Sequence, residues 1–139
     1  MTINYYNENA QIFFETTVNA DMKGIYREFE KNLSKNVSIL DLGCWSGRDS
    51  RYFLDQGYKV TSTDISDELI KKANEHLGIN VLKLDMKKMD FQNEFDGIWA
   101  CASILHIPRN EILKVLDNCY SALKKTGFYI QVLNTETER

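Results

Sequence analysis

The fold of this chain is decided by one stretch, Val37-Ser38-Ile39-Leu40-Asp41-Leu42-Gly43-Cys44-Trp45-Ser46-Gly47-Arg48. A short apolar run ends in an acid, and two glycines four residues apart follow before a segment that can form a helix. This order predicts a glycine turn at the carboxyl end of a buried strand, where an open α/β sheet binds its ligand. A second acid, Asp64, ends the next apolar run about twenty residues later, the separation at which such folds reach ribose hydroxyls. The two features indicate a site for a nucleoside-bearing cofactor.

Composition and charge narrow the class of protein. The chain has 139 residues, enough for a single domain with one core. Its formal charge of −3 argues against nucleic acid or an anionic membrane as the main partner. The N-terminus lacks the basic start and apolar stretch of a signal peptide, and three cysteines in unrelated contexts give no disulfide framework and no metal-binding pair. We expect one cytoplasmic domain over residues 1–139 with reduced thiols, no metal, no nucleic acid and no membrane partner.

Five apolar runs predict strands, and the segments between them have helical spacing. Strands that alternate with helices indicate parallel β-α-β units with right-handed crossovers. We therefore expect an α/β fold: a Rossmann-like parallel sheet with strand order 3-2-1-4-5 and helices on both faces. The ligand is expected across the strand ends at Leu42, Thr63 and Ala100. The predicted strands are Val37–Leu42, Tyr58–Thr63, Ile79–Leu84, Phe95–Ala100 and Phe128–Leu133.

Caps and glycines mark the expected helix boundaries. Ser66 is expected to cap the helix that follows it, and Gly78 to end that helix. Pro108 is expected as the first residue of the last helix, and Gly127 as the left-handed residue that closes it. One or two helices are expected over Glu8–Leu33. The last helix carries an apolar stripe at three-and-four spacing, made of Ile112, Leu113, Val115, Leu116, Cys119, Tyr120 and Leu123.

The acid before the glycine loop argues against a dinucleotide. Gly43 and Gly47 allow the backbone to approach a ligand where a Cβ would clash. Their spacing is GxxxG rather than GxGxxG, and Asp41 would repel a phosphate while accepting hydrogen bonds from an ammonium group. This pattern favours a cofactor with an amino-acid end over a nicotinamide dinucleotide.

Two further acids suit the rest of such a cofactor. Asp64 can accept hydrogen bonds from both ribose hydroxyls with its two oxygens. Asp85 ends the third apolar run and can accept a hydrogen bond from the exocyclic adenine amine. Met86 beside it offers an apolar surface to the ring. We therefore expect Asp41, Asp64 and Asp85 to converge on one crevice.

Taken together, these motifs resemble the class I S-adenosylmethionine-dependent methyltransferases, in particular the small bacterial, tellurite-resistance-type enzymes. The resemblance implies that S-adenosylmethionine is the cofactor and that its methyl group goes to a small-molecule acceptor. It covers nearly the whole chain and is carried by Tyr5–Ala10, Ile39–Cys44, Ser46–Asp49, Thr63–Ser66, Leu84–Met86, Phe95–Ser103, Leu105–Pro108 and Leu123–Gly127. The cofactor-binding residues it implies are Asp41, Gly43, Cys44, Gly47, Arg48, Asp64, Ile65, Asp85, Met86 and Cys101, and it assigns the methionine part to the glycine loop.

The chain departs from the family pattern at two places. Trp45 occupies a position where the pattern usually has a third glycine, and a positive φ there would cost roughly 1–2 kcal/mol. The family usually continues past the fifth strand with a helix and an antiparallel strand pair, whereas this sequence ends at Arg139. We therefore expect self-association through the exposed fifth strand, or a fragment of a longer protein.

Several alternatives stay open from the sequence. The domain could be a non-catalytic binding or structural protein whose pocket is blocked by Trp45, and a nicotinamide-dependent oxidoreductase is disfavoured. His106 could be a base or an ordinary loop residue. Arg48 could touch the cofactor carboxylate or form a surface salt bridge. Cys44 could be a low-pKa thiol or a small pocket-lining residue. The chain contains no evident catalytic constellation, which suits a reaction that depends on positioning.

Overall fold

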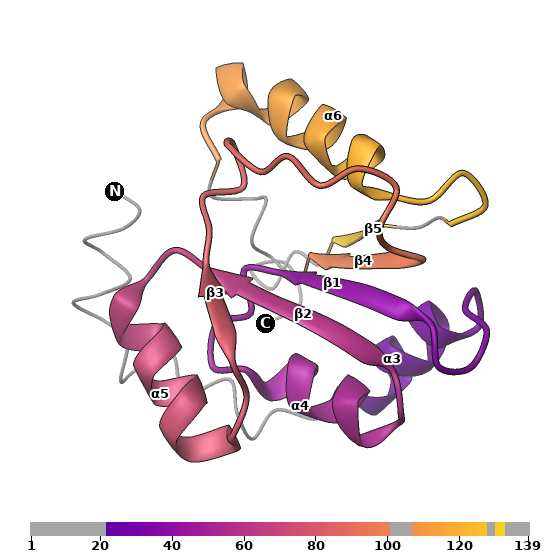
Figure 1. Ribbon diagram of the computed structural model, residues 1–139, viewed down its shortest axis with the longest axis vertical. Helices are drawn as coiled ribbons and strands as arrows, with labels where there is room; N and C mark the ends of the chain where they lie inside the picture. The colour runs from indigo at the N-terminus through magenta and orange to yellow at the C-terminus, as the bar shows by residue number, and fades with distance from the viewer. Residues whose placement is uncertain (1–21, 101–106, 128–129, 133–139) are drawn as a thin grey trace.

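A computed structural model describes residues 22–100, 107–127 and 130–132 of the chain, the last three by their backbone. These residues form a sheet of parallel strands with helices on both of its faces (Figure 1). Among them no helix is long and apolar enough to cross a membrane. The elements are α3 (Lys23–Glu30), β1 (Ser38–Leu42), α4 (Arg48–Asp55), β2 (Lys59–Asp64), α5 (Asp67–Leu77), β3 (Val81–Lys83), β4 (Gly97–Ala100), the 3₁₀ turn Arg109–Glu111, α6 (Ile112–Ala122) and β5 (Ile130–Val132).

The strand order in the sheet is β3-β2-β1-β4-β5, and every neighbouring pair is parallel. The predicted Rossmann-like order of the first four strands is confirmed. The chain runs outward from β1 to β3 and then returns to the other side of β1 as β4, so the switch point lies beside β1. In an open α/β sheet this is where ligands bind.

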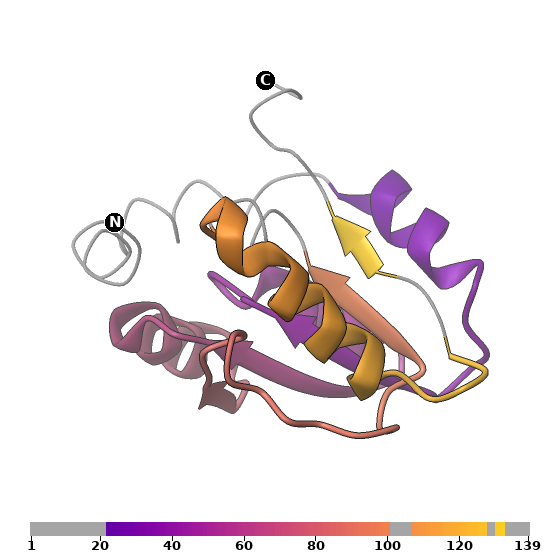
Figure 2. The ribbon, with the colours of Figure 1, turned by 90° about the horizontal axis from the view of Figure 1, so that it is seen from above.

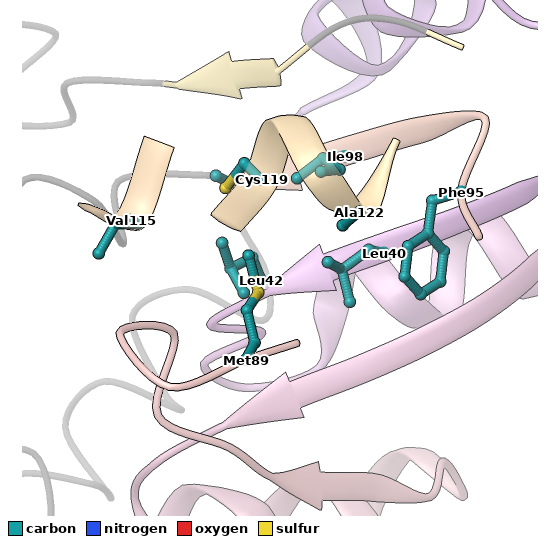
Figure 3. Close-up of a cluster of buried hydrophobic side chains, with 9 residues drawn as sticks. Leu40, Leu42, Met89, Phe95, Ile98, Val115, Cys119 and Ala122 are labelled. Carbon is teal, nitrogen blue, oxygen red and sulfur yellow. The ribbon is translucent and has the colours of Figure 1, made fainter. Parts of the chain in front are cut away.

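Alternation along the strands divides the core into two layers. Successive residues of a strand point to opposite faces, and both faces are covered by helices. Leu40 and Leu42 of β1 face α6, where they join a cluster of buried apolar side chains (Figure 3). Seen from above, α6 lies over β1 and β4 (Figure 2). The other members of this cluster are Met89, Phe95, Ile98, Ala100, Val115, Cys119 and Ala122.

The opposite layer is aromatic. Ile39 of β1 and Trp99 of β4 face α3 and α4, where they pack with Tyr26, Phe29 and Phe53. The Trp99 ring meets the rings of Phe29 and Phe53 edge-on, with centroids 5.1 Å and 5.3 Å away, an arrangement that suits the ring quadrupoles. By the same alternation Asp41 lies on the α4 side of β1. The first of the predicted acids is therefore buried beneath α4.

The boundaries of α5 agree with the predicted caps, whereas those of α6 differ from the prediction. Ser66 caps α5 by accepting a hydrogen bond from the backbone N–H of Leu69 at 3.2 Å, and Gly78 ends α5 with φ of 64°, as predicted. Pro108 precedes the 3₁₀ turn and is not itself helical, because its ψ is 141°.

Gly127 does not close α6, so that prediction is wrong. The helix ends at Ala122, and the next residue is already extended with φ of −77° and ψ of 144°. Gly127 is needed for a different reason. A Cβ there would lie 2.8 Å from the carbonyl oxygen of Phe95 and 3.1 Å from the Cα of Asp96. The glycine thus allows two backbone segments to touch.

The apolar stripe of α6 is only partly buried. Val115 and Cys119 are inaccessible, whereas Leu113 is 73% exposed and Tyr120 is 81% exposed. The expected helices over Glu8–Leu33 are represented by α3, and residues 8–21 lie outside the described part of the chain.

Candidate functional site

The loop between β1 and α4 takes an unusual path. Three of its residues have left-handed backbone: Gly43 with φ of 74°, Trp45 with φ of 55° and Gly47 with φ of 87°. For glycine this conformation is free of strain, but for tryptophan it costs roughly 1–2 kcal/mol. The conditional expectation for Trp45 is therefore met: the position does require positive φ, and the chain carries a strained residue in the centre of the loop.

The packing of Gly47 is as demanding as its backbone. A Cβ at this residue would lie 2.5 Å from Cδ1 of Ile79 and 3.0 Å from Cβ of Ala73. The start of α4 is therefore packed closely against α5 and against Ile79, which lies two residues before β3. This glycine is needed for helix packing, independently of any ligand.

The end of β2 holds this loop in place. The hydroxyl of Thr63 donates to the carbonyl oxygen of Asp41 at 3.0 Å and accepts from the N–H of Gly43 at 3.4 Å. The N–H of Cys44 donates to the carbonyl oxygen of Thr63 at 2.7 Å. The loop after β1 is thus fastened to β2, which limits its freedom before any ligand arrives.

Asp64 joins the two loops that follow β1 and β2. Its Oδ2 accepts the N–H of Trp45 at 2.9 Å, and its Oδ1 accepts the N–H groups of Ile65 at 2.8 Å and Ser66 at 3.0 Å. Burial raises the pKa of Asp64, and these three hydrogen bonds oppose that rise. Since a carboxylate has about four acceptor positions, Oδ2 is the oxygen with capacity left for a ligand hydroxyl.

Asp41 is buried with one oxygen satisfied and one not. Only 1% of the residue is exposed. Its Oδ2 accepts the hydroxyl of Ser50 at 2.6 Å, while its Oδ1 has no hydrogen-bond partner among the described residues. Burial and the nearby carboxyls of Asp49 and Asp64 raise the pKa of Asp41 well above its usual value. A buried acceptor without a donor is costly, so the described residues leave the hydrogen-bonding requirement of this oxygen unmet.

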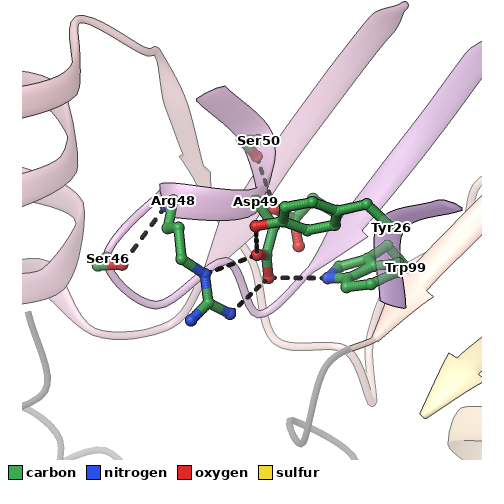
Figure 4. Close-up of polar contacts among 7 residues, drawn as sticks. Tyr26, Ser46, Arg48, Asp49, Ser50 and Trp99 are labelled. Atoms are coloured by element: carbon green, nitrogen blue, oxygen red, sulfur yellow. Dashed lines mark hydrogen bonds and ion pairs between the residues drawn. The ribbon is translucent and has the colours of Figure 1, made fainter. Parts of the chain in front are cut away.

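Asp49 heads a second buried network, which the sequence did not predict (Figure 4). Its Oδ1 accepts the hydroxyl of Tyr26 and the Nε of Arg48, the latter at 2.8 Å. Its Oδ2 accepts Nη2 of Arg48 at 3.2 Å and the indole Nε1 of Trp99 at 2.8 Å. All four acceptor positions are occupied, and the carboxylate lies in the first turn of α4, where the helix dipole favours negative charge.

Arg48 is therefore not in a surface salt bridge. The side chains of Arg48 and Asp49 are 15% and 5% exposed, so the pair is largely buried. This overturns the surface alternative. The contact of Arg48 with a cofactor carboxylate stays a prediction.

Cys44 is not an activated thiol. The residue is 2% exposed, and burial together with Asp41 and Asp64 raises the pKa of its thiol well above the usual value. The low-pKa alternative is wrong, since thiolate formation is disfavoured here. Cys101 and His106 lie outside the described residues.

The third acid lies beside the second. The N–H of Leu84, the residue before Asp85, donates to the carbonyl oxygen of Asp64 at 2.8 Å, which continues the pairing of β2 with β3 by one residue. The Asp85 side chain accepts the N–H of Lys87 at 2.9 Å. Asn118 of α6 holds the same turn by donating to the carbonyl oxygens of Met86 at 3.1 Å and Lys87 at 3.2 Å.

The three predicted acids thus lie at the carboxyl ends of three adjacent strands: Asp41 on β1, Asp64 on β2 and Asp85 after β3. Asp41 and Asp64 are close enough for the charge of one to affect the other. Ile65 is half-buried beside Asp64.

Comparison with known proteins identifies the family. The model of a methyltransferase domain family matches residues 39–127. The chain belongs to this family. The match begins in β1 and includes the glycine loop, Asp64, Asp85 and α6, so all of the site residues described above except Tyr26 lie within it.

Individual relatives agree with this assignment. The chain is 25% identical over 142 residues to the "Probable S-adenosyl-L-methionine-dependent methyltransferase TehB" of Haemophilus influenzae, an alignment that covers 99% of this chain and 49% of that protein. Among solved structures it is similar to a TehB-like SAM-dependent methyltransferase from Corynebacterium glutamicum, with a TM-score of 0.73 and 25% identity over 89% of this chain and 70% of the other.

The PH0226 protein of Pyrococcus horikoshii has the same fold, with a TM-score of 0.79 and 24% identity over 96% of this chain and 68% of the other. The chain spans about half the length of the curated relatives that it matches over most of its own length. Family membership therefore applies to this domain.

Proposed function

We propose that this domain binds S-adenosylmethionine at the carboxyl ends of β1, β2 and β3 and transfers its methyl group to a small-molecule acceptor. The observation that carries the proposal is the buried Oδ1 of Asp41, which has no partner in the described part of the chain and lies near the carboxyls of Asp49 and Asp64. Asp41 and Asp64 are both buried, and the guanidinium of Arg48 is engaged by Asp49. A ligand with a positive sulfonium and a positive ammonium group suits a site that contains these two buried carboxyl groups.

Each predicted residue receives a part of the cofactor. We assign the methionine part to the loop from Gly43 to Gly47, with the ammonium group on Asp41 and the carboxylate near Arg48. The ribose falls to Asp64, through the oxygen that retains acceptor capacity, and the adenine falls to Asp85 with Met86 and Ile65. Cys44 and Cys101 line the pocket in this assignment.

The bound cofactor supplies a methyl group already activated by a positively charged sulfur. The residues of the chain need only hold the reacting groups in line and exclude water. No general base is therefore required for an acceptor that is already nucleophilic, and we assign no catalytic residue.

The acceptor class, location and assembly are further parts of the proposal. The net charge of −3 favours a small molecule over nucleic acid as acceptor, and the two described cysteines, Cys44 and Cys119, are unbridged, as in the cytoplasm. Among the described residues β5 pairs only with β4, which suits self-association through β5. Light scattering at several concentrations tests this assembly, and a monomer throughout contradicts it.

Calorimetry with S-adenosylhomocysteine tests the cofactor assignment directly. We expect micromolar binding by the wild type. Asp64→Ala should weaken it by at least about 2 kcal/mol, because ligand hydroxyls lose their charged acceptor. Asp55→Ala, in an exposed pair with Arg51, is the matched control and should bind like the wild type.

Two results would contradict the proposal as a whole, and a third would refute one of its assignments. The absence of binding by the folded wild type would contradict cofactor use, and binding of NADH instead would indicate an oxidoreductase. An unchanged Kd in Asp64→Ala would refute the ribose assignment alone.

A further inference from the structure

We propose that Ser50 and Ser62 are positioning residues of the cofactor site, which hold the carboxylate of Asp41 through Oδ2 and thereby keep Oδ1 available to the ammonium group of the ligand. The inference rests on the proposed function, because it specifies how the chain prepares one contact of that site. Neither serine was expected as a site residue, and neither is placed in contact with the cofactor.

The geometry gives the hydrogen-bond chain a direction. The hydroxyl of Ser50 donates to Oδ2 of Asp41 at 2.6 Å, and the hydroxyl oxygens of Ser50 and Ser62 lie 2.5 Å apart. A serine hydroxyl has one proton, and that of Ser50 is used on the carboxylate. With Asp41 ionised, Ser62 therefore donates to Ser50, and the chain runs from β2 through α4 to β1.

Burial makes this chain rigid. Ser50 is 0% exposed, Ser62 is 3% exposed and Asp41 is 1% exposed, so water does not replace a missing partner. Ser50 is the only described residue that donates a hydrogen bond to the Asp41 side chain. Polarisation along a hydrogen-bond chain strengthens each link, so Ser62 supports the bond that Ser50 makes.

The surroundings of Asp41 show why such support is needed. Burial and the neighbouring carboxyls favour the neutral acid, whereas the Ser50 hydroxyl favours the carboxylate and lowers the pKa of Asp41. On the β4 side the register neighbour is the neutral Trp99. The charged and titratable groups that face Asp41 are Arg48 and Asp49 on α4, Asp64 at the end of β2 and Cys44 in the loop after β1.

Loss of the Ser50 hydroxyl should therefore act through the ionisation of Asp41. The ammonium group needs a carboxylate, so affinity rises with pH until Asp41 is ionised and then levels. In Ser50→Ala the pKa of Asp41 is higher, and this rise in affinity should move to higher pH. At a pH below the pKa of Asp41, affinity follows the small ionised fraction of this carboxyl. A hydrogen bond to a charged group is strong enough to change that fraction, and with it the Kd, by about tenfold or more.

The experiment measures the Kd of S-adenosylhomocysteine by calorimetry across a pH series, in the wild type, Ser50→Ala, Ser62→Ala, Asp41→Asn and the double variant Ser50→Ala with Asp41→Asn. Ser121→Ala, an exposed serine of α6, is the control. We expect Ser50→Ala to shift the profile most, Ser62→Ala less, and Ser121→Ala not at all. In the Asp41→Asn background Ser50→Ala should have no further effect on the pH profile.

Carbon-13 NMR of the side-chain carboxyls in the ligand-free protein gives a second measurement, with Asp41→Asn used to assign the resonance. We expect the Asp41 titration to move to higher pH in Ser50→Ala and, by less, in Ser62→Ala. This measurement keeps the inference testable where a variant binds too weakly for calorimetry.

The outcomes separate the inference from the proposed function. A wild type that binds no S-adenosylhomocysteine contradicts the proposed function, and with it the role of these serines in the site. A wild type that binds, with Ser50→Ala profiles and Asp41 titration unchanged, overturns the inference alone. An equal loss at every pH that persists in the Asp41→Asn background shows a structural role only, and also overturns it.

Discussion

Asp41 and Asp49 are both buried carboxylates near the start of α4, yet their surroundings are opposite. Asp49 receives four hydrogen bonds from three side chains, whereas Asp41 receives one and keeps an oxygen that has no partner among the described residues. Within the described part of the chain, the acceptors of Asp49 are all satisfied and those of Asp41 are not. A buried acid whose acceptors are filled holds a structure together, and one with a vacant acceptor points to a ligand.

The largest expected effect is on the complete network. Asp49→Asn removes the carboxylate that pairs with the buried guanidinium of Arg48, and it disturbs the hydrogen bonds donated by Tyr26 and Trp99. We expect the free energy of unfolding to fall by about 3–5 kcal/mol, measured by urea denaturation. Asp55→Asn breaks the exposed pair with Arg51 and should cost less than about 1 kcal/mol. Equal losses in the two variants would refute the structural role of Asp49.

Asp41→Asn should change the free energy of unfolding in the opposite direction to Asp49→Asn. The pKa of Asp41 is higher in the folded protein than in the unfolded chain, so the folded state binds more protons and stability falls as pH rises from about 4. Removing the charge relieves this penalty, and a tenfold difference between the two acid dissociation constants is worth about 1.4 kcal/mol.

We therefore expect Asp41→Asn to raise the free energy of unfolding at pH 7, by on the order of 1 kcal/mol, while it weakens cofactor binding. Its stability should also depend less on pH than that of the wild type between pH 4 and neutrality, although Asp64, with a raised pKa, preserves part of the dependence. A variant as destabilised as Asp49→Asn would remove the distinction between the two acids.

The strained backbone of Trp45 lies in the loop beside Asp41, so it offers a further test of how this site differs from that of Asp49. Trp45→Gly and Trp45→Ala both remove the indole, but only glycine relieves the φ of 55°. We expect the glycine variant to be more stable than the alanine variant by roughly 1 kcal/mol, measured by thermal and urea unfolding. Equal stabilities would show that this turn is not strained.

The smallest expected effect is on the stability at high pH, and it involves two tyrosines that pack near the Asp49 network. Tyr52 and Tyr58 donate to Glu30 at 2.6 Å and 3.0 Å, and their pKa values are raised to about 12 by partial burial and this carboxylate. In the unfolded chain they ionise near pH 10, so the folded state holds more protons and stability is lost between pH 10 and 12. Tyr58→Phe should lose less stability across that window in circular dichroism titrations. A slope like that of the wild type would contradict this contribution.

The positions of Asp41 and Asp64 could be predicted from the sequence, because the motifs that mark them are local. Asp41 and Asp64 each end an apolar run, and parallel strands bring such ends to one edge of the sheet. The resemblance to the family, which usually has a glycine at position 45, raised the question of a positive φ there, and Trp45 does have a φ of 55°. The sequence could not predict which oxygen of Asp64 accepts which N–H group, since these hydrogen bonds depend on how the loops after β1 and β2 meet.

The Asp49 network could not be predicted, because the partners of Asp49 are distant in the sequence. Tyr26 and Trp99 lie 23 and 50 residues from Asp49, and no spacing rule joins them. The available signal was a tryptophan in a fully buried strand, since a buried indole N–H requires an acceptor. The same reason explains Gly127, where contact with the backbone of Phe95, rather than helix ending, decides the residue.

The amide of Asn118 gives α6 a share in the turn that carries Met86. Exchange of this helix between relatives would therefore also disturb the turn to which we assign the adenine ring. We expect chimeras that retain an asparagine at position 118 to preserve this turn better than those that lose it.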